Sequence, residues 1–342
     1  GAGDATDDTT SSLVKLYHAT NVSLTDMTLA YGSCKHMVEV AAMKNFYVTN
    51  CHFKYTKRER EGSERCEALQ LDVCCNSGAF NTGYNDGTPL DGVYITGCNF
   101  YEVLDGVGTH SALVGSYHRN IVIQNNSFTN ISGNAIEGVS YENCDISNNK
   151  MYNCGGGISV KSFFEPTAYA QSNYIFTHAF DGATPCNNTP SYNGGLVVYG
   201  NTITQKTGGY NTVFGIEIKG GYLNYPTYSK EGVMIPQRDY FYNNVSVKNN
   251  NVASIGRGIE IYDVRQAVVA YNTITLRGAS ESNVGVYVSR GSTVTKLLKN
   301  TINSINPNAY GIYVADDAVV SNIKSNSISK TKMGIVLISG GT

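Results

Sequence analysis

Four acidic side chains stand in short segments of alternating apolar and polar residues. They are Asp72 in ALQLD, Glu137 in AIEG, and Glu217 and Glu260 in two copies of GIEI. Enzymes that hydrolyse glycosidic bonds use two carboxyl groups, about 5 to 5.5 Å apart when the sugar configuration is retained and about 6.5 to 9.5 Å apart when it is inverted. These four carboxylates are therefore the candidate catalytic acids, bases or nucleophiles.

An imidazole and an amine occur in equivalent segments and could assist proton transfer. His110 follows DGVGT and Lys161 follows GISV, and either side chain can act as an acid or a base when its surroundings adjust its pKa. A structural interpretation competes for each residue. His110 and Asp72 could form a hydrogen-bonded pair. Glu217 and Glu260, beside Lys161 and Lys219, could form only an ion-pair ladder on a solvated face.

The candidate substrate-binding residues are polar or aromatic and stand in the same segments or in nearby tyrosine-rich stretches. They are Gln70, Lys219, Tyr262, Tyr222 and Tyr225. Tyrosine has an amphipathic ring with a polar tip, which suits contact with sugar rings. Because the chain contains 25 Tyr and no Trp, tyrosine must supply any aromatic surface for a sugar. Packing within loops is the alternative interpretation for the tyrosine-rich stretches.

The elements that carry these residues repeat along the chain. An aliphatic residue, two variable residues, Asn or Cys, one variable residue and then an aliphatic residue or Phe recur at spacings of roughly 22 to 28 residues, a period typical of solenoids. The central residues of the clear copies are Cys51, Cys98, Asn126, Asn149, Asn201, Asn250, Asn272, Asn300 and Asn326. The pattern predicts stacked coils, with the Asn side chains bonded to the backbone of adjacent coils at a tight turn.

A second segment follows each copy, and in it a small residue begins a strand of alternating side chains. Because side chains alternate between the two faces of a strand, aligning these segments predicts two rows that point away from the core. The first outward row contains Glu39, Gln70, Gly108, Glu137, Ser159, Glu217, Glu260, Tyr287, Tyr313 and Val336. The second outward row contains Ala41, Asp72, His110, Val139, Lys161, Lys219, Tyr262, Ser289, Ala315 and Ile338.

Polar groups concentrate in the second to seventh coils of both rows, so this face is the predicted site. Glu39, at its edge, is expected to be only a surface residue. Neighbouring parallel strands lie about 4.8 Å apart, which puts Glu217 and Glu260 one step apart and Glu137 and Glu217 two steps apart, roughly 10 Å. Both glycosidase spacings are therefore available.

The fold class that follows is all-β: a single-stranded right-handed parallel β-helix of about ten coils. We expect one domain over residues 1–342 that forms part of a larger protein. Doubled spacings predict three long loop insertions around the site face, at about 54–66 together with 73–92, at 163–193, and at 220–242. Because solenoids need covered ends, further domains or oligomerisation are expected to cap the terminal coils.

Composition excludes several other classes. The 27 acidic and 25 basic residues give a net charge of −2, which argues against a nucleic-acid partner and disfavours a strongly anionic polymer as substrate. No apolar run is long enough to span a membrane. The nine cysteines lack paired zinc-type spacing, so no metal or cofactor is expected, and Cys51 and Cys98 are predicted to be buried free thiols.

The coils resemble those of the right-handed parallel β-helix superfamily typified by pectate lyases. The runs HMVEV, EALQLD and DGVGTHS at 36–40, 67–72 and 105–111 are similar to those of glycan-cleaving β-helix glycoside hydrolases of gut bacteria, of the lacto-N-biosidase type. That resemblance implies two acidic side chains in a pocket on the helix face and a carbohydrate substrate. It also implies a secreted bacterial protein, extracellular or at the cell surface, although the polar start GAGDATDDTT contains no signal peptide.

Two alternatives to a glycoside hydrolase follow from other resemblances. GISVKS at 157–162 is similar to the lysine-bearing strand of alginate and chondroitin lyases, which implies a polysaccharide lyase with Lys161 or His110 as base and with calcium. Phage tailspikes of the same superfamily imply a third hypothesis, a non-catalytic glycan-binding adhesin or tailspike-like module. A glycoside hydrolase acting on an oligo- or polysaccharide is the leading hypothesis.

Overall fold

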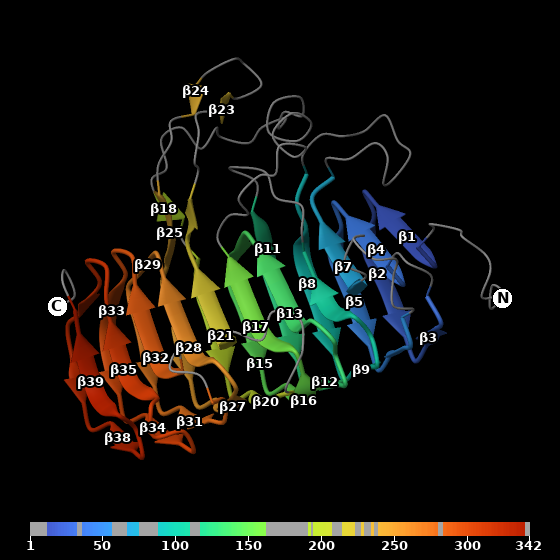
Figure 1. Ribbon diagram of the computed structural model, residues 1–342. Helices are drawn as coiled ribbons and strands as arrows, with labels where there is room; N and C mark the ends of the chain where they lie inside the picture. Colours follow the sequence, from blue (N-terminus) through green and yellow to red (C-terminus); the bar gives the residue numbers. More distant parts are fainter. Residues whose placement is uncertain are drawn as a thin grey trace.

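The chain winds into three long parallel sheets that run side by side along one axis (Figure 1). The computed structural model describes residues 12–32, 36–56, 67–74, 88–109, 117–161, 191–192, 194–206, 214–222, 227–228, 234–235, 239–279 and 283–338. Within each sheet, neighbouring strands come from successive coils and pair in parallel. The protein is therefore a right-handed parallel β-helix, as the repeat predicts.

The first sheet carries the predicted site. Its strands are, in order, β1 (Val14–Tyr17), β4 (Val38–Ala41), β7 (Glu67–Asp72), β10 (Asp105–Gly108), β13 (Asn134–Val139), β17 (Gly156–Lys161), β21 (Phe214–Lys219), β28 (Arg257–Tyr262), β32 (Val284–Ser289), β35 (Tyr310–Val314) and β39 (Met333–Leu337). Each strand lies beside its neighbours in this order, and β1 and β39 lie at opposite ends of the stack (Figure 1).

The second and third sheets complete each coil. The second contains β2 (Thr20–Thr25), β5 (Lys44–Thr49), β8 (Asp91–Thr96), β11 (His118–Gln124), β15 (Cys144–Ser147), β19 (Leu196–Tyr199), β26 (Ser246–Lys248), β30 (Ala267–Ala270), β33 (Thr293–Leu298) and β36 (Val319–Val320), with β14 (Tyr141–Glu142) and β37 (Ile323–Lys324) attached. The third contains β3 (Thr28–Ala30), β6 (His52–Lys54), β9 (Asn99–Tyr101), β12 (Ser127–Thr129), β16 (Lys150–Cys154), β20 (Thr202–Gln205), β27 (Asn251–Ser254), β31 (Thr273–Leu276), β34 (Thr301–Ser304) and β38 (Ser327–Ser329).

Short strands occur where insertions are predicted. In the regions 163–193 and 220–242 the structure describes β18 (Ser191–Tyr192), β22 (Gly221–Tyr222), β23 (Thr227–Tyr228), β24 (Met234–Ile235) and β25 (Asp239–Asn243). β25 pairs with β18 and β22, and also with β29 (Val264–Arg265) in the next coil. Most of the other residues in the predicted insertions lie outside the described ranges. Among the described residues, no helix is long and apolar enough to cross a membrane.

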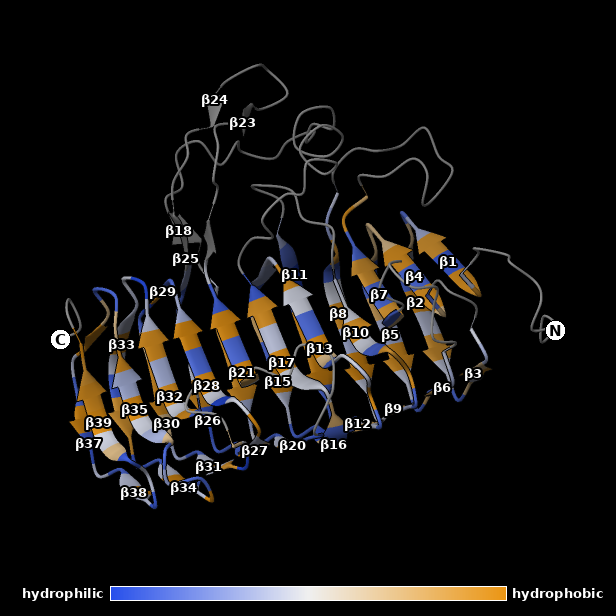
Figure 2. Cartoon of the chain, viewed as in Figure 1, coloured by the Kyte–Doolittle hydropathy of each residue, from blue (hydrophilic) through white to orange (hydrophobic). Residues whose placement is uncertain are grey.

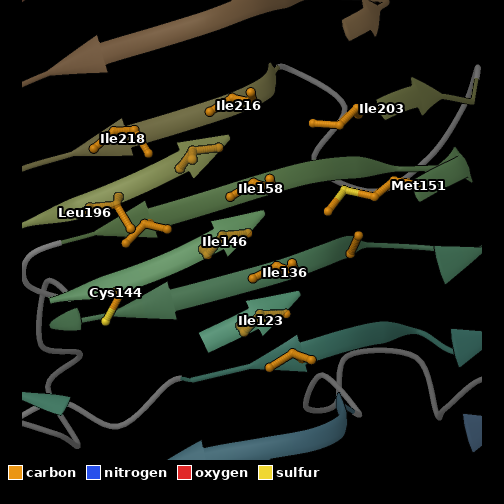
Figure 3. Close-up of a cluster of buried hydrophobic side chains, with 14 of the residues drawn as sticks. Ile123, Ile136, Cys144, Ile146, Met151, Ile158, Leu196, Ile203, Ile216 and Ile218 are labelled. Atoms are coloured by element: carbon orange, nitrogen blue, oxygen red, sulfur yellow. The ribbon is translucent and has the colours of Figure 1, made fainter. Parts of the chain in front are cut away.

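The core lies between the three sheets and is built from inward side chains in register. Apolar and polar bands cross the strands of the first sheet (Figure 2), and residues such as Ile136 and Ile158 line its inner side (Figure 3). In the third sheet Phe53, Phe100 and Phe128 stack, with centroid distances of 4.8 and 4.6 Å. This burial is the main favourable contribution to folding, because removing apolar surface from water stabilises about 25 cal/mol per Å².

The recurring asparagines form a hydrogen-bonded ladder at one turn of the coil. Asn201 Nδ2 donates to the carbonyl of Ile146 and to Oδ1 of Asn250, and the backbone N–H of Asn201 donates to the same Oδ1. The pattern repeats in each coil from Asn126 to Asn300. The predicted structural role of these asparagines is confirmed, because each amide satisfies buried backbone groups that would otherwise lack partners.

Two cysteines occupy the same turn in the coils that precede the ladder. Cys51 and Cys98 are buried free thiols, as predicted, and the backbone N–H of Cys98 donates to Oδ1 of Asn126. Burial raises the pKa of Cys98 to about 11, so its sulfur stays a neutral thiol at physiological pH.

The small residue that begins strands of the first sheet is required by close approach between coils. A Cβ atom on Gly157 would lie 2.1 Å from the carbonyl oxygen of Gly215, and one on Gly285 would lie 2.6 Å from that of Gly311. In the last described coil, a Cβ atom on Gly334 would meet nothing within 4 Å. The glycines therefore let neighbouring strands pack closely, which explains part of the high Gly content.

The C-terminal coil leaves inward-type side chains uncovered. Ile335 pairs with Ile312, and Leu337 pairs with Val314. Ile312 and Val314 are fully buried, whereas Ile335 is 49 % exposed and Leu337 is 55 % exposed. Within the described residues, the apolar core is thus open at this end.

Candidate functional site

The strand register confirms the predicted alignment of the first outward row. Glu39 pairs with Gln70, Gly108 with both Gln70 and Glu137, and Ser159 with both Glu137 and Glu217. The row continues through Glu260, Tyr287, Tyr313 and Val336. The period-2 alternation of these strands therefore brings residues far apart in sequence onto one line across the first sheet.

The second outward row is confirmed over the strands that the structure describes. Asp72 pairs with Ala41, and the line from Val139 runs through Lys161, Lys219 and Tyr262 to Ser289. His110 lies outside the described residues, and so does Tyr225. Tyr222 ends the short strand β22, and its side chain also lies outside the description.

Burial of the acidic residues is much greater than expected for side chains that point away from the core. Asp72, Glu137, Glu217 and Glu260 are each 9 % exposed or less. The prediction that Glu39 is a surface residue is wrong, because it is buried. Its carboxylate accepts a hydrogen bond from Ser12 Oγ at 2.7 Å and lies 3.2 Å from Lys15 Nζ.

Glu67 joins the first outward row although it begins strand β7 and stands outside the predicted alternation. A Cβ atom on Gly108 would lie 2.1 Å from Cγ of Glu67, so the Glu67 side chain fills the space that Gly108 leaves between Gln70 and Glu137. His36 Nδ1 lies 2.9 Å from Oε2 of Glu67. The sequence contained one indication of this arrangement: Gly108 occupies a position of the first outward row but has no side chain, so a neighbouring side chain can fill the space.

The N-terminal part of the face is held by contacts among its own side chains. Gln70 Nε2 donates to Oδ2 of Asp72 on the same strand. Glu137 accepts from Lys161 Nζ at 3.0 Å and from Asn134 Nδ2 at 2.8 Å, one donor on each oxygen. Both oxygens of Glu137 are therefore engaged, one by an amide and the other by a cation.

Glu217 and Glu260 form the other part of the face and are direct partners on β21 and β28. Oε2 of Glu217 accepts a hydrogen bond from Ser159 Oγ at 2.6 Å, and Oε1 of Glu260 accepts one from Arg257 Nη1. Within the described part of the chain, the second oxygen of each carboxylate has no hydrogen-bond partner, and neither of these oxygens is fully buried. Each carboxylate is therefore anchored on one side and available on the other.

The environment of Glu260 favours its protonated form. Burial raises the pKa of Glu260, the nearby charge of Glu217 raises it further, and Arg257 opposes both effects. A carboxyl group with a raised pKa keeps its proton at higher pH, which is the property of a general acid. Arg257 was missed from the sequence because it begins β28 and lies outside both predicted rows.

Cations and an aromatic ring adjoin this pair in the second outward row. Lys219 Nζ lies 4.8 Å from the ring centroid of Tyr262, and the guanidinium carbon of Arg290 lies 4.9 Å from it. Arg290 also donates to the Tyr262 hydroxyl and lies 3.5 Å from Oδ2 of Asp263. Arg290 follows β32 at a turn with a positive φ of 48°, so strand alternation alone does not reveal it.

No group of three or more His, Cys, Asp or Glu side chains is arranged to hold a metal ion among the residues that the structure describes. The described face presents carboxylate, hydroxyl, amide and cationic groups.

Fold and face together define a right-handed parallel β-helix with a buried carboxylate pair on its first sheet. The sequence matches no family model. It also matches no curated protein. Among solved structures, the chain is similar to PfbA, a surface adhesin of Streptococcus pneumoniae, with a TM-score of 0.62 and 16 % identity over 88 % of this chain and 63 % of the adhesin chain.

A second structure of PfbA, described as a surface protein and adhesin, gives a TM-score of 0.59 and 16 % identity, covering 92 % of this chain and 68 % of that one. An alginate lyase from a Paenibacillus species gives a TM-score of 0.37 and 12 % identity over 89 % of this chain and 99 % of the lyase. The chain thus spans less than two thirds of the first adhesin structure. At these identities the likeness to PfbA shows the shared β-helix fold.

Proposed function

We propose that this protein is a glycoside hydrolase that cleaves an oligo- or polysaccharide, with Glu260 as general acid and Glu217 as nucleophile. The observation that supports this most directly is the in-register pair itself: two buried carboxylates, each with one anchored and one available oxygen. Neighbouring strands are about 4.8 Å apart, which is close to the carboxyl separation of retaining enzymes.

The roles follow from the different surroundings of the two carboxylates. Glu260, with its raised pKa, donates a proton to the glycosidic oxygen as the bond to the anomeric carbon breaks. The available oxygen of Glu217 attacks that carbon and forms a glycosyl ester, while Ser159 holds the other oxygen. Glu260, now ionised, then takes a proton from a water molecule that attacks the ester and frees Glu217.

The lyase alternative has less support in the geometry. A lysine that abstracts a proton must direct its nitrogen at the substrate, but Lys161 Nζ is engaged by the buried carboxylate of Glu137, to which it donates at 3.0 Å.

A non-catalytic surface adhesin is the second candidate function, and the likeness to the PfbA adhesin favours it. In that case the same buried polar face would bind a glycan without turnover. A place outside the cell, secreted or at the cell surface, fits either candidate and is part of the proposal.

The test is incubation of the protein with a panel of oligosaccharides, followed by measurement of new reducing ends and of unsaturated products. We expect new reducing ends without unsaturated sugars, and loss of this activity in E217Q and E260Q. The matched control is E142Q, because Glu142 pairs with the half-exposed Arg119 on the second sheet. Binding without any turnover would favour the adhesin, and full activity in both variants would overturn the assigned pair.

A further inference from the structure

The guanidinium of Arg257 contacts both the carboxylate of Glu260 and the ring of Tyr287. Its Nη1 donates to Oε1 of Glu260, and its central carbon lies 4.0 Å from the centroid of the Tyr287 ring. A guanidinium so close to the centroid of an aromatic ring makes a cation–π contact. In the described part of the chain, no other carboxylate lies within ion-pair distance of Arg257. Glu260 and Tyr287 are therefore the two groups that hold this charge.

Strand alternation alone does not bring Arg257 to Glu260. Three residues separate the two along β28, and side chains at odd separations leave opposite faces of a strand. The long arginine side chain must therefore extend around the start of the strand to reach the carboxylate, and it is 28 % exposed there. Fixing such a flexible side chain costs conformational entropy, and water competes for its partner. A second contact on the guanidinium thus strengthens its pairing with Glu260.

Tyr287 is supported on the side away from Arg257. It is the direct partner of Glu260 on β32, and its ring stacks on Tyr313 of β35 with the centroids 5.6 Å apart. Strands β28 and β35 flank β32 on opposite sides. The ring of Tyr310 meets that of Tyr313 edge-on at a centroid distance of 5.4 Å. The aromatic rings of these coils therefore form a support, and its last ring contacts the guanidinium.

We propose that Tyr287 is a positioning residue that holds the Arg257 guanidinium against the carboxylate of Glu260. This inference rests on the proposed function, since it concerns the general acid of the same site. A cation close to a carboxylate favours its ionised form, so the ring acts on Glu260 through Arg257. Without the ring, the guanidinium would spend less time beside Glu260, and this carboxyl group would keep its proton to higher pH.

Other groups around Glu260 stay unchanged in the test. The titratable or charged side chains near Glu260 or Tyr287, apart from Arg257, are Tyr262 on β28, Glu217 and Lys219 on β21, and Asp316 after β35. The Tyr287 ring also contributes to the burial that raises the pKa of Glu260. Removing the ring therefore lowers this pKa by admitting water and raises it by releasing Arg257. A double-mutant cycle separates the two effects, because only the second requires Arg257.

The pKa of Glu260 is measured by NMR titration of protein isotope-labelled at the glutamate carboxyl carbons, with E260Q to identify the signal. Y287L removes the ring, Y287F keeps it, and each is made in the wild type and in R257Q. We expect Y287L to raise the pKa relative to Y287F by about half a pH unit more in the wild-type background than in R257Q, the size of one cation–π contact. Y287F alone should keep the pKa of the wild type.

Y271L is the matched control. Tyr271 lies between β30 and β31, outside the first sheet, and Lys299 Nζ lies 5.3 Å from its ring centroid. This variant also removes a ring from beneath a cation, and it should leave the pKa of Glu260 unchanged. Thermal unfolding checks that each variant is folded, and Y287M replaces Y287L in the same cycle if the leucine variant does not fold.

An equal difference between Y287L and Y287F in the two backgrounds would overturn the inference, because Tyr287 would then act on Glu260 without Arg257. If the wild-type protein hydrolyses glycans but this coupling is absent, the hydrolase proposal stands and the positioning role is wrong. If the coupling is present but no glycan is cleaved, the positioning role stands and the hydrolase proposal fails.

Discussion

Three features of its surroundings affect the pKa of Glu260, so this pKa is a test of the proposed mechanism. Burial and the charge of Glu217 raise the pKa, and the guanidinium of Arg257 lowers it. The proton of a general acid must be present for the first step, so activity is lost as pH rises through this pKa. Because the pKa is raised, the alkaline limb of the pH profile lies above that of an exposed glutamate.

The first prediction concerns Arg257. R257Q removes the influence that lowers the pKa of Glu260, so the pKa rises further and the alkaline limb of kcat/KM moves to higher pH. The measurement is the pH profile of hydrolysis for the wild type and R257Q, with R119Q as a control on the second sheet. A shift of the limb to lower pH would contradict the role given to Glu260.

The second prediction separates Glu137 from the reacting pair. E137A removes the acceptor of both Lys161 and Asn134 and leaves the buried Asn134 amide without this partner, a loss of about 1 to 3 kcal/mol in the free energy of unfolding. E142A removes a more exposed ion pair and should cost less than about 1 kcal/mol. Thermal unfolding of both variants measures the difference, and equal stability would argue against a structural role for Glu137.

At the residue scale the sequence predicts positions better than surroundings. Strand alternation places Glu217 and Glu260 in register without any structure. It does not reveal that these carboxylates are buried, because burial depends on contacts made by residues outside the row. The alignment of strands also misses Glu67 and Arg257. Each is the first residue of its strand and lies outside the aligned positions, but its side chain extends onto the face.

Among the elements, the strands of the first sheet depend on glycine where successive coils meet. The repeat in the sequence predicts a small residue at this position and the order of the coils. The structure shows why the residue is glycine: a Cβ atom there would be too close to the backbone of the next coil. The distance between two coils cannot be read from the sequence of one segment.

The third prediction uses two glycines of this column. G285A would bring a Cβ atom to 2.6 Å from the carbonyl oxygen of Gly311 and equally close to Ile302, and such overpacking should destabilise by about 1 to 3 kcal/mol. G334A is the matched control, because its Cβ atom would meet nothing within 4 Å. Denaturant unfolding should show a loss for G285A and little change for G334A; equal losses would contradict the close-approach explanation.

For the molecule as a whole, stability should vary along the axis, because an interior coil is covered on both sides. Coil order, the parallel sheets and the position of the core follow from the sequence repeat. Segments that lack the repeat have no sequence period from which their conformation could be predicted. The contribution of the tyrosine-rich stretches to the site stays a prediction.

The fourth prediction compares identical residues at equivalent positions in two coils. I312A removes a fully buried side chain and should cost about 2 to 5 kcal/mol. I335A removes the paired side chain of the last described coil, which is half exposed, and should cost about 1 kcal/mol or less. Thermal unfolding of the two variants decides the matter, and similar losses would mean that the C-terminal coil is covered in solution.

Because the coils stack at a fixed spacing, the separation of the reacting carboxylates can change only in steps of one strand spacing. Glu217 and Glu260 can be one strand spacing apart or two, but no distance between these is available to a regular β-helix. Inserting one additional coil between β21 and β28 would widen the pair from about 4.8 Å to roughly 9.5 Å without turning either side chain away. Such a protein would have room for a water molecule where the glycosyl ester formed, so a change of coil number would change the stereochemistry of the product.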